Sequence, residues 1–259
     1  MIQGIIEMMS YPFMTRAFLV GSLVALCSAL LGVSLVLKRY SMIGDGLSHV
    51  GFGAMAIAAA MNAAPLAVAI PIVIVAAVLL LRINSNAKIK GDAAIALIST
   101  SSLAIGVMVI SLTTGMNTDV YNYMFGSILA MSSDDLKLSV ILSVIVLILF
   151  IFFYHKIFAI TFDETFARAT GVKAGIYNTL IAVLTAVTIV LGMRMMGALL
   201  ISSLIIFPAL TSMRVCRKFK SVILNSAVLS VVCLIAGLTI SYVGAVSYTH
   251  LTLPTICSV

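Results

Sequence analysis

Residues 41–60 read SMIGDGLSHVGFGAMAIAAA, a mostly apolar run that nevertheless carries an aspartate and a histidine. A helix that crosses a bilayer needs about 20 predominantly apolar residues, and this run has that length. Asp45 and His49 are four residues apart, so on a helix they lie on the same face. Ionisable side chains inside a membrane are costly, and they usually face a pathway or a cavity. The stretch therefore predicts a membrane helix that carries a functional polar pair.

The whole chain has the composition of an integral membrane protein. Its 259 residues are 63% hydrophobic and only 9% charged, and its mean hydropathy is +1.26. Between the hydrophobic runs, residues 120–131 are expected to form a short interfacial or re-entrant helix. The predicted fold is all-α, a polytopic membrane protein with about eight transmembrane helices at residues 17–37, 43–61, 63–81, 93–114, 138–154, 176–193, 195–213 and 222–243.

The basic residues predict the orientation of these helices. Cytoplasmic loops carry an excess of lysine and arginine. If the first helix runs from outside to inside, Arg16, Lys137 and Arg194 fall outside with the N-terminus. The net charge of +7 then reflects anchoring at the membrane rather than nucleic-acid binding. Twelve of the fifteen basic residues share the predicted cytoplasmic side: Lys38, Arg39, Arg82, Lys88, Lys90, Lys156, Arg168, Lys173, Arg214, Arg217, Lys218 and Lys220.

The longest predicted cytoplasmic segment, residues 159–178, contains the helix-like sequence FDETFARATGV. Thr161 or Asp163 is suited to cap the first turn of this helix, and Gly171 is suited to end it. Phe162 and Phe166 would be its apolar anchors. The residues alone leave two interpretations open: a helix that docks on a partner, or a plain connection with an interfacial helix.

Four stretches together resemble one family, the permeases of metal-type ABC importers for zinc, manganese and iron. They are KRYSMIGDGLSHVGFGAMAIA (38–58), GDAAIALISTSSLAIGVMVIS (91–111), FDETFARATGV (162–172) and MGALLISSLIIFPALTS (196–212), in the same order as in that family. The resemblance covers roughly residues 15–243. It implies a single permease domain over 1–243, with a cytoplasmic coupling helix at about 162–171. Residues 244–259 do not resemble the family, so we expect a truncated or non-native tail there.

The resemblance also implies a function. The chain would be the permease subunit of an ATP-driven importer of a divalent transition metal in the bacterial plasma membrane, with zinc favoured and manganese or iron as alternatives. Asp45 and His49 match the positions that line the metal path. No permanently bound cofactor is expected. The implied partners are a second permease subunit, usually identical, ABC ATPase subunits and an extracytoplasmic metal-binding protein. The residues that would couple the chain to the ATPase are Phe162, Asp163, Glu164, Phe166, Arg168 and Gly171.

Other interpretations of the pair remain. Asp45 and His49 could form an internal hydrogen bond that holds helices together. The chain could be an ATP-independent secondary transporter, although no clear internal repeat is seen. An intramembrane hydrolase that uses Asp45 and His49 lacks a second membrane aspartate for a catalytic dyad. The phosphate-binding motif GxxxxGK(S/T) is absent from the sequence, so ATP hydrolysis would belong to a separate subunit.

Overall fold

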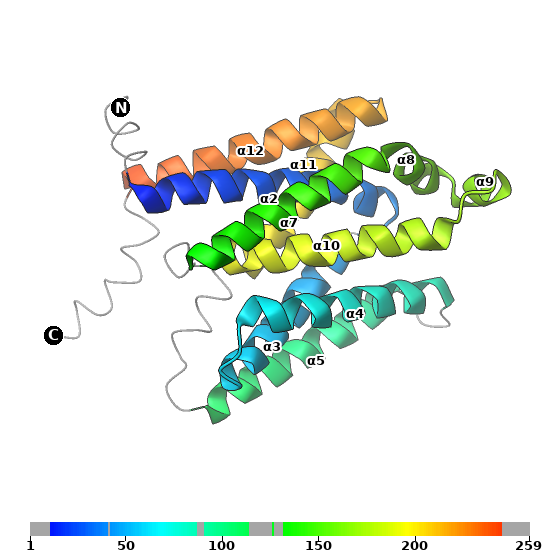
Figure 1. Cartoon of the computed structure of the whole chain (residues 1–259). Coiled ribbons are helices and arrows are strands. Elements are labelled where there is room, and N and C mark those ends of the chain that lie inside the picture. The colour runs from blue at the N-terminus through cyan, green and yellow to red at the C-terminus, as the bar shows by residue number, and fades with distance from the viewer. Residues whose placement is uncertain (1–10, 41, 87–90, 114–125, 127–131, 245–259) are drawn as a thin grey trace.

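The computed structural model describes residues 11–40, 42–86, 91–113, 126 and 132–244, and within them the regular structure is entirely α-helical (Figure 1). The predicted helix at 120–131 and the predicted tail at 244–259 lie almost entirely outside these residues. The helices are α2 (Pro12–Leu37), α3 (Met42–Ala60), α4 (Pro65–Asn86), α5 (Gly91–Leu112), α7 (Ser133–Phe152), α8 (Tyr154–Phe162), α9 (Glu164–Ala169), α10 (Ala174–Met196), α11 (Ala198–Val215) and α12 (Phe219–Gly244).

In this part of the chain, eight helices are long and apolar enough to cross a membrane, which confirms the predicted all-α polytopic fold. The boundary between the sixth and seventh spans differs from the prediction. Arg194 and its flanking glycines were expected to separate them; Arg194 lies in the last turn of α10, and the break comes at one of these glycines, Gly197. Gly197 has φ of 86°, a left-handed conformation that glycine adopts without the steric cost of a Cβ atom.

The helices α3, α4 and α5 form one side of the bundle, and α2, α7 and α12 form the other (Figure 1). Helix α10 lies between them, because it contacts α2 on one side and α3 and α4 on the other. Of the eight spans, α3 has the lowest mean hydropathy, 1.2, and yet 72% of that span is buried inside the protein. The most polar span is therefore an internal helix rather than a lipid-facing one.

Charged contacts distinguish the two ends of the bundle. At one end, Lys38 at the C-terminal end of α2 pairs with Glu164 of α9. At the opposite end of α10, Arg194 pairs with Asp135 of α7, with 3.0 Å between Nη2 and Oδ2. Helices α8 and α9 lie at the first end, and α2 begins at the other (Figure 1). Lys38 and Glu164 thus share one end, and Arg194 and Asp135 the other, as the threading requires; that the α9 end faces the cytoplasm stays a prediction.

Candidate functional site

Helix α3 presents Asp45 and His49 on the same face, as their spacing predicted. Asp45 lies in the first turn of α3, and His49 follows one turn later. His49 Nε2 is 3.7 Å from Asp45 Oδ2, close enough for an ion pair but too long for a hydrogen bond. The Asp45 side chain is 43% exposed and that of His49 is 22% exposed. The two side chains are therefore adjacent but not hydrogen-bonded to each other, and both are accessible from outside the chain.

The remaining faces of α3 are closed by helices of the same chain. A Cβ atom at Gly53 would lie 2.7 Å from the carbonyl oxygen of Ser102 on α5, and one at Gly46 would lie 2.6 Å from the side chain of Ile95. The glycines of α3 therefore allow α5 to approach closely. Helix α3 also packs against α4, α10 and α11.

The pair is too small to hold a metal by itself. Structural zinc sites have four protein ligands, and catalytic sites usually have three. In the part of the chain that the structure describes, no group of three or more His, Cys, Asp or Glu side chains could hold a metal ion. Asp45 and His49 supply two ligands, an oxygen and a nitrogen, so any fuller coordination must draw on water or on another polypeptide.

The second predicted site lies in the segment that connects α8, α9 and α10. Asp163 caps α9, because its Oδ1 accepts a hydrogen bond from the backbone N–H of Phe166 at 2.9 Å. This hydrogen bond, with a second from the Thr165 hydroxyl, lowers the pKa of the Asp163 carboxyl. Thr161, the alternative cap, instead donates to the Ile157 carbonyl within α8. The structure thus selects Asp163 between the two predicted caps.

The end of α9 also follows the sequence. Gly171 has φ of 85°, and the N–H of Val172 donates to the Ala167 carbonyl at 2.9 Å, the hydrogen bond of a Schellman motif. The helix itself is shorter than the predicted range of about 162–171, since it covers only Glu164–Ala169. Phe162 ends α8 instead of beginning the coupling helix, because the extended backbone of Asp163 separates the two helices.

The two predicted aromatic anchors differ in their surroundings. The Phe162 ring packs against Phe158 and Phe219, with ring centroids 4.9 and 5.5 Å away, although the residue remains 59% exposed. Phe166 is 66% exposed on the short helix α9, at the edge of the bundle (Figure 1). A large apolar side chain so placed is available to a partner.

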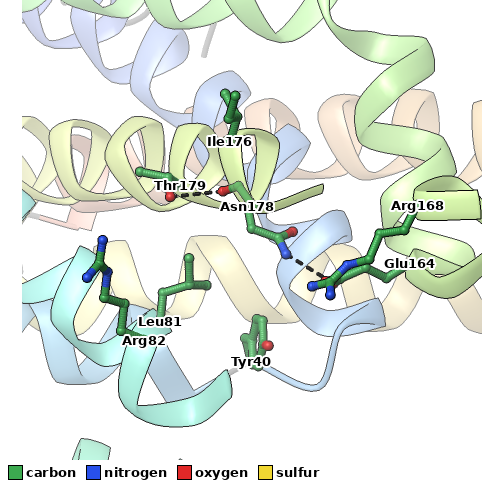
Figure 2. A pocket seen from close by; sticks show the side chains of 9 residues that line it. Tyr40, Leu81, Arg82, Glu164, Arg168, Ile176, Asn178 and Thr179 are labelled. Atoms are coloured by element: carbon green, nitrogen blue, oxygen red, sulfur yellow. Dashed lines mark hydrogen bonds and ion pairs between the residues drawn. The ribbon is translucent and has the colours of Figure 1, made fainter. Parts of the chain in front are cut away.

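Glu164, also predicted to contact the ATPase, has several partners within its own chain. Its Oε1 lies 2.5 Å from Arg168 Nη2, and its Oε2 lies 3.0 Å from Asn178 Nδ2 and 3.4 Å from Lys38 Nζ. Sequence reasoning did not single out Lys38 or Asn178 for this site, because 126 residues separate Lys38 from Glu164. A pocket of about 460 Å³ adjoins these groups (Figure 2), and its lining comprises Tyr40, Leu81, Arg82, Glu164, Arg168, Gly175, Ile176, Asn178 and Thr179.

Comparison with known proteins relates this geometry to a family. Residues 10–253 match the model of the ABC 3 transport family. The chain is 31% identical to the high-affinity zinc uptake system membrane protein ZnuB of Haemophilus influenzae, over 89% of this chain and 88% of that protein. It is 28% identical to the manganese transport system membrane protein MntC of Listeria monocytogenes, over 91% of this chain and 84% of that protein.

A solved structure agrees with the sequence comparison. A chain in the structure of PsaBC from Streptococcus pneumoniae in complex with Fab superimposes with a TM-score of 0.84 and 28% sequence identity, covering 95% of this chain and 89% of that one. The family match, the relatives and the eight apolar helices identify a multi-pass protein of the bacterial plasma membrane. The chain belongs to the ABC 3 transport family, whose members are the permease subunits of metal-type ABC transporters.

Proposed function

We propose that this chain is the permease subunit of an importer that carries a divalent transition metal ion into the cell, driven by ATP hydrolysis on separate subunits. The observation that carries the proposal is the pair Asp45 and His49 on the buried helix α3. A carboxylate and an imidazole in a membrane helix are the ligand types that divalent transition metals prefer. Their partial exposure leaves both groups accessible to an ion that passes along this face of α3.

The incomplete ligand set supports an assembly of two permease subunits around a central path. Two identical copies would contribute an aspartate and a histidine each, which gives up to four protein ligands for one ion. A path site must replace part of the hydration shell of the ion and still release it. Such a shared site, without a cysteine thiolate, suits transient binding. An extracytoplasmic metal-binding protein would deliver the ion, and ABC ATPase subunits would dock on α9.

Zinc is the favoured cargo, and manganese is the second candidate. Imidazole nitrogen suits zinc, and for a given site the usual order of affinities places zinc above manganese and ferrous iron. The similarity to ZnuB agrees with zinc, whereas the similarity to MntC favours manganese. The delivery protein can select the ion, so the permease need not discriminate strongly between the two metals.

The proposal is tested in cells by deleting the gene and measuring metal content and growth in chelator-treated medium. We expect the deletion strain to accumulate less zinc, to stop growing at a chelator concentration that the parent tolerates, and to recover when zinc is added or the gene is restored. Recovery with manganese alone would assign manganese as the cargo. Unchanged zinc and manganese contents under depletion, with unchanged growth, would contradict the proposal.

A further inference from the structure

An ion pair joins the proposed coupling segment to the C-terminal end of α2, the helix that precedes the one carrying Asp45 and His49. Lys38 follows the last residue of α2, and its Nζ lies 3.4 Å from Oε2 of Glu164, the first residue of α9. The same ammonium group donates a hydrogen bond to Oδ1 of Asn178 in the first turns of α10. Asn178 also donates to Glu164, which closes a three-membered network among α2, α9 and α10 (Figure 2 shows the Asn178–Glu164 bond).

The side chain of Lys38, the member of this network that comes from α2, is buried. The Lys38 side chain is only 8% exposed, whereas that of Glu164 is 32% exposed beside the pocket. A lysine is rarely buried so deeply unless it is paired. Burial lowers the pKa of Lys38 in spite of the attraction of Glu164. Burial also opposes ionisation of Glu164, but the hydrogen bonds from Asn178 and Arg168 and the charge of Lys38 outweigh it, so the pKa of Glu164 is lowered.

Both pKa values are lowered, but with opposite effects on charge: the shift disfavours the charged form of Lys38 and favours that of Glu164. The geometry decides in favour of an ion pair, because the Lys38 ammonium contacts oxygen atoms of both Glu164 and Asn178. Separating Glu164 from Lys38 would leave the buried ammonium without its charged partner, which is energetically costly. Helix α9 is therefore tied to α2 by a contact that resists separation.

A hydrogen bond closes the end of α2, just before α3. Arg39 adopts a left-handed conformation with φ of 62°, and the N–H of Tyr40 donates to the Leu35 carbonyl at 2.8 Å. This is a Schellman-type end to α2, which fixes the direction in which the chain leaves the helix. Helix α3 then begins at Met42, and Asp45 lies in its first turn. Asp45 therefore follows Lys38 by only seven residues along the chain.

We propose that the Lys38–Glu164 ion pair, bridged by Asn178, transmits ATPase-driven movement of α9 to α3 and thereby couples ATP hydrolysis to metal movement. The inference rests on the proposed function. It makes Lys38, Glu164 and Asn178 positioning residues, because the proposed ligands of the ion are Asp45 and His49. The amount of metal transported per ATP hydrolysed tests this role. If the contact served only to hold the fold together, a variant that still assembles would keep the wild-type ratio.

The test uses the full permease, purified with its ATPase subunits and reconstituted in vesicles, with radioactive zinc as the probe. In Lys38→Met, Glu164 keeps Asn178 and Arg168 as partners, so the chain should still assemble with the ATPase and hydrolyse ATP. We expect zinc transported per ATP to fall about tenfold, a typical size for coupling between two sites. The double variant Lys38→Glu with Glu164→Lys restores the pair in reverse but places the new ammonium beside Arg168, so it should recover only part of the ratio. Asn178→Ala should give a smaller loss in the same direction.

Lys220→Met is the matched control, since this lysine is exposed in the first turn of α12 and its replacement should leave the ratio unchanged. A Lys38→Met protein with the wild-type ratio would overturn the inference, and so would one that loses ATPase association, because Lys38 would then act only in assembly. If Lys38→Met does not fold, an Asn178→Ala protein with the wild-type ratio would overturn it equally. Failure of the wild-type permease to take up zinc or manganese with ATP is a separate result, which refutes the proposed function itself.

Discussion

Replacing Asp45 or His49 by alanine is expected to reduce ATP-driven metal uptake to the background of vesicles without the transporter. Each substitution removes one of the two ligands that a subunit offers, and in a pair of subunits it removes half of the proposed coordination sphere. The side chains are partly exposed on α3 and lie 3.7 Å apart without a hydrogen bond between them, so their loss should not open the helix packing. Uptake of radioactive zinc and manganese by reconstituted vesicles measures the effect, with expression and ATPase association as checks.

Near-isosteric variants separate a ligand from a structural contact. Asp45→Asn and His49→Gln keep polar side chains and hydrogen-bonding capacity, but asparagine and glutamine are weaker ligands for a transition metal. We expect both to lose uptake as the alanine variants do. Asp134→Ala and His155→Ala are controls of the same residue types at exposed positions, and they should transport normally. If the Asp45 and His49 variants also transport normally, the pair is only a helix contact and the route of the ion lies elsewhere.

Replacing Phe166 by aspartate is expected to abolish association with the ATPase subunits while the membrane helices remain folded. Phe166 is 66% exposed on α9, so its replacement removes little packing within the chain. An aromatic anchor at the centre of an interface typically contributes at least about 2 kcal/mol, which is roughly a thirtyfold change in affinity. A buried, unpaired carboxylate in the same position would add a desolvation cost. Co-purification of the ATPase with a tagged permease measures the loss.

A matched control is Val215→Asp, which places the same charge at a 73% exposed apolar residue that ends α11. We expect this variant to retain the ATPase. The cap of α9 is unaffected in Phe166→Asp, because Asp163 accepts its hydrogen bond from the backbone of residue 166 rather than from the ring. Retention of the ATPase by Phe166→Asp at the wild-type level would show that the docking surface lies elsewhere.

The parts of the fold that the sequence predicted are those with a local cause. The eight spans could be predicted from their long apolar runs, because each span needs only its own hydrophobic residues to enter a bilayer. The roles of Asp163 as a cap and Gly171 as a helix end could be predicted, because both act within a few residues of the chain. The break between the sixth and seventh spans was predicted at Arg194 and its flanking glycines, and it falls on one of them, Gly197, because the left-handed backbone there suits a glycine.

Contacts between segments far apart in the sequence could not be predicted in this way. Lys38 served only as a flanking charge in the sequence, yet it lies beside Glu164 and Asn178, which are 126 and 140 residues away. No pattern along the chain encodes that pairing, because it arises from the packing of α2, α9 and α10. For Asp45 and His49, the helical spacing predicted a shared face. The burial of α3 and the accessibility of that face became clear only from the folded chain.

The central claim, that this chain moves a divalent metal ion along Asp45 and His49 with energy from ATP, is tested most directly by uptake into vesicles. The permease and its ATPase are reconstituted, radioactive zinc or manganese is supplied with the delivery protein, and uptake is compared with ATP, with a non-hydrolysable ATP analogue and without nucleotide. The account predicts uptake only with hydrolysable ATP, and none in the Asp45→Asn variant. Uptake that persists without nucleotide would contradict it and would favour a secondary transporter.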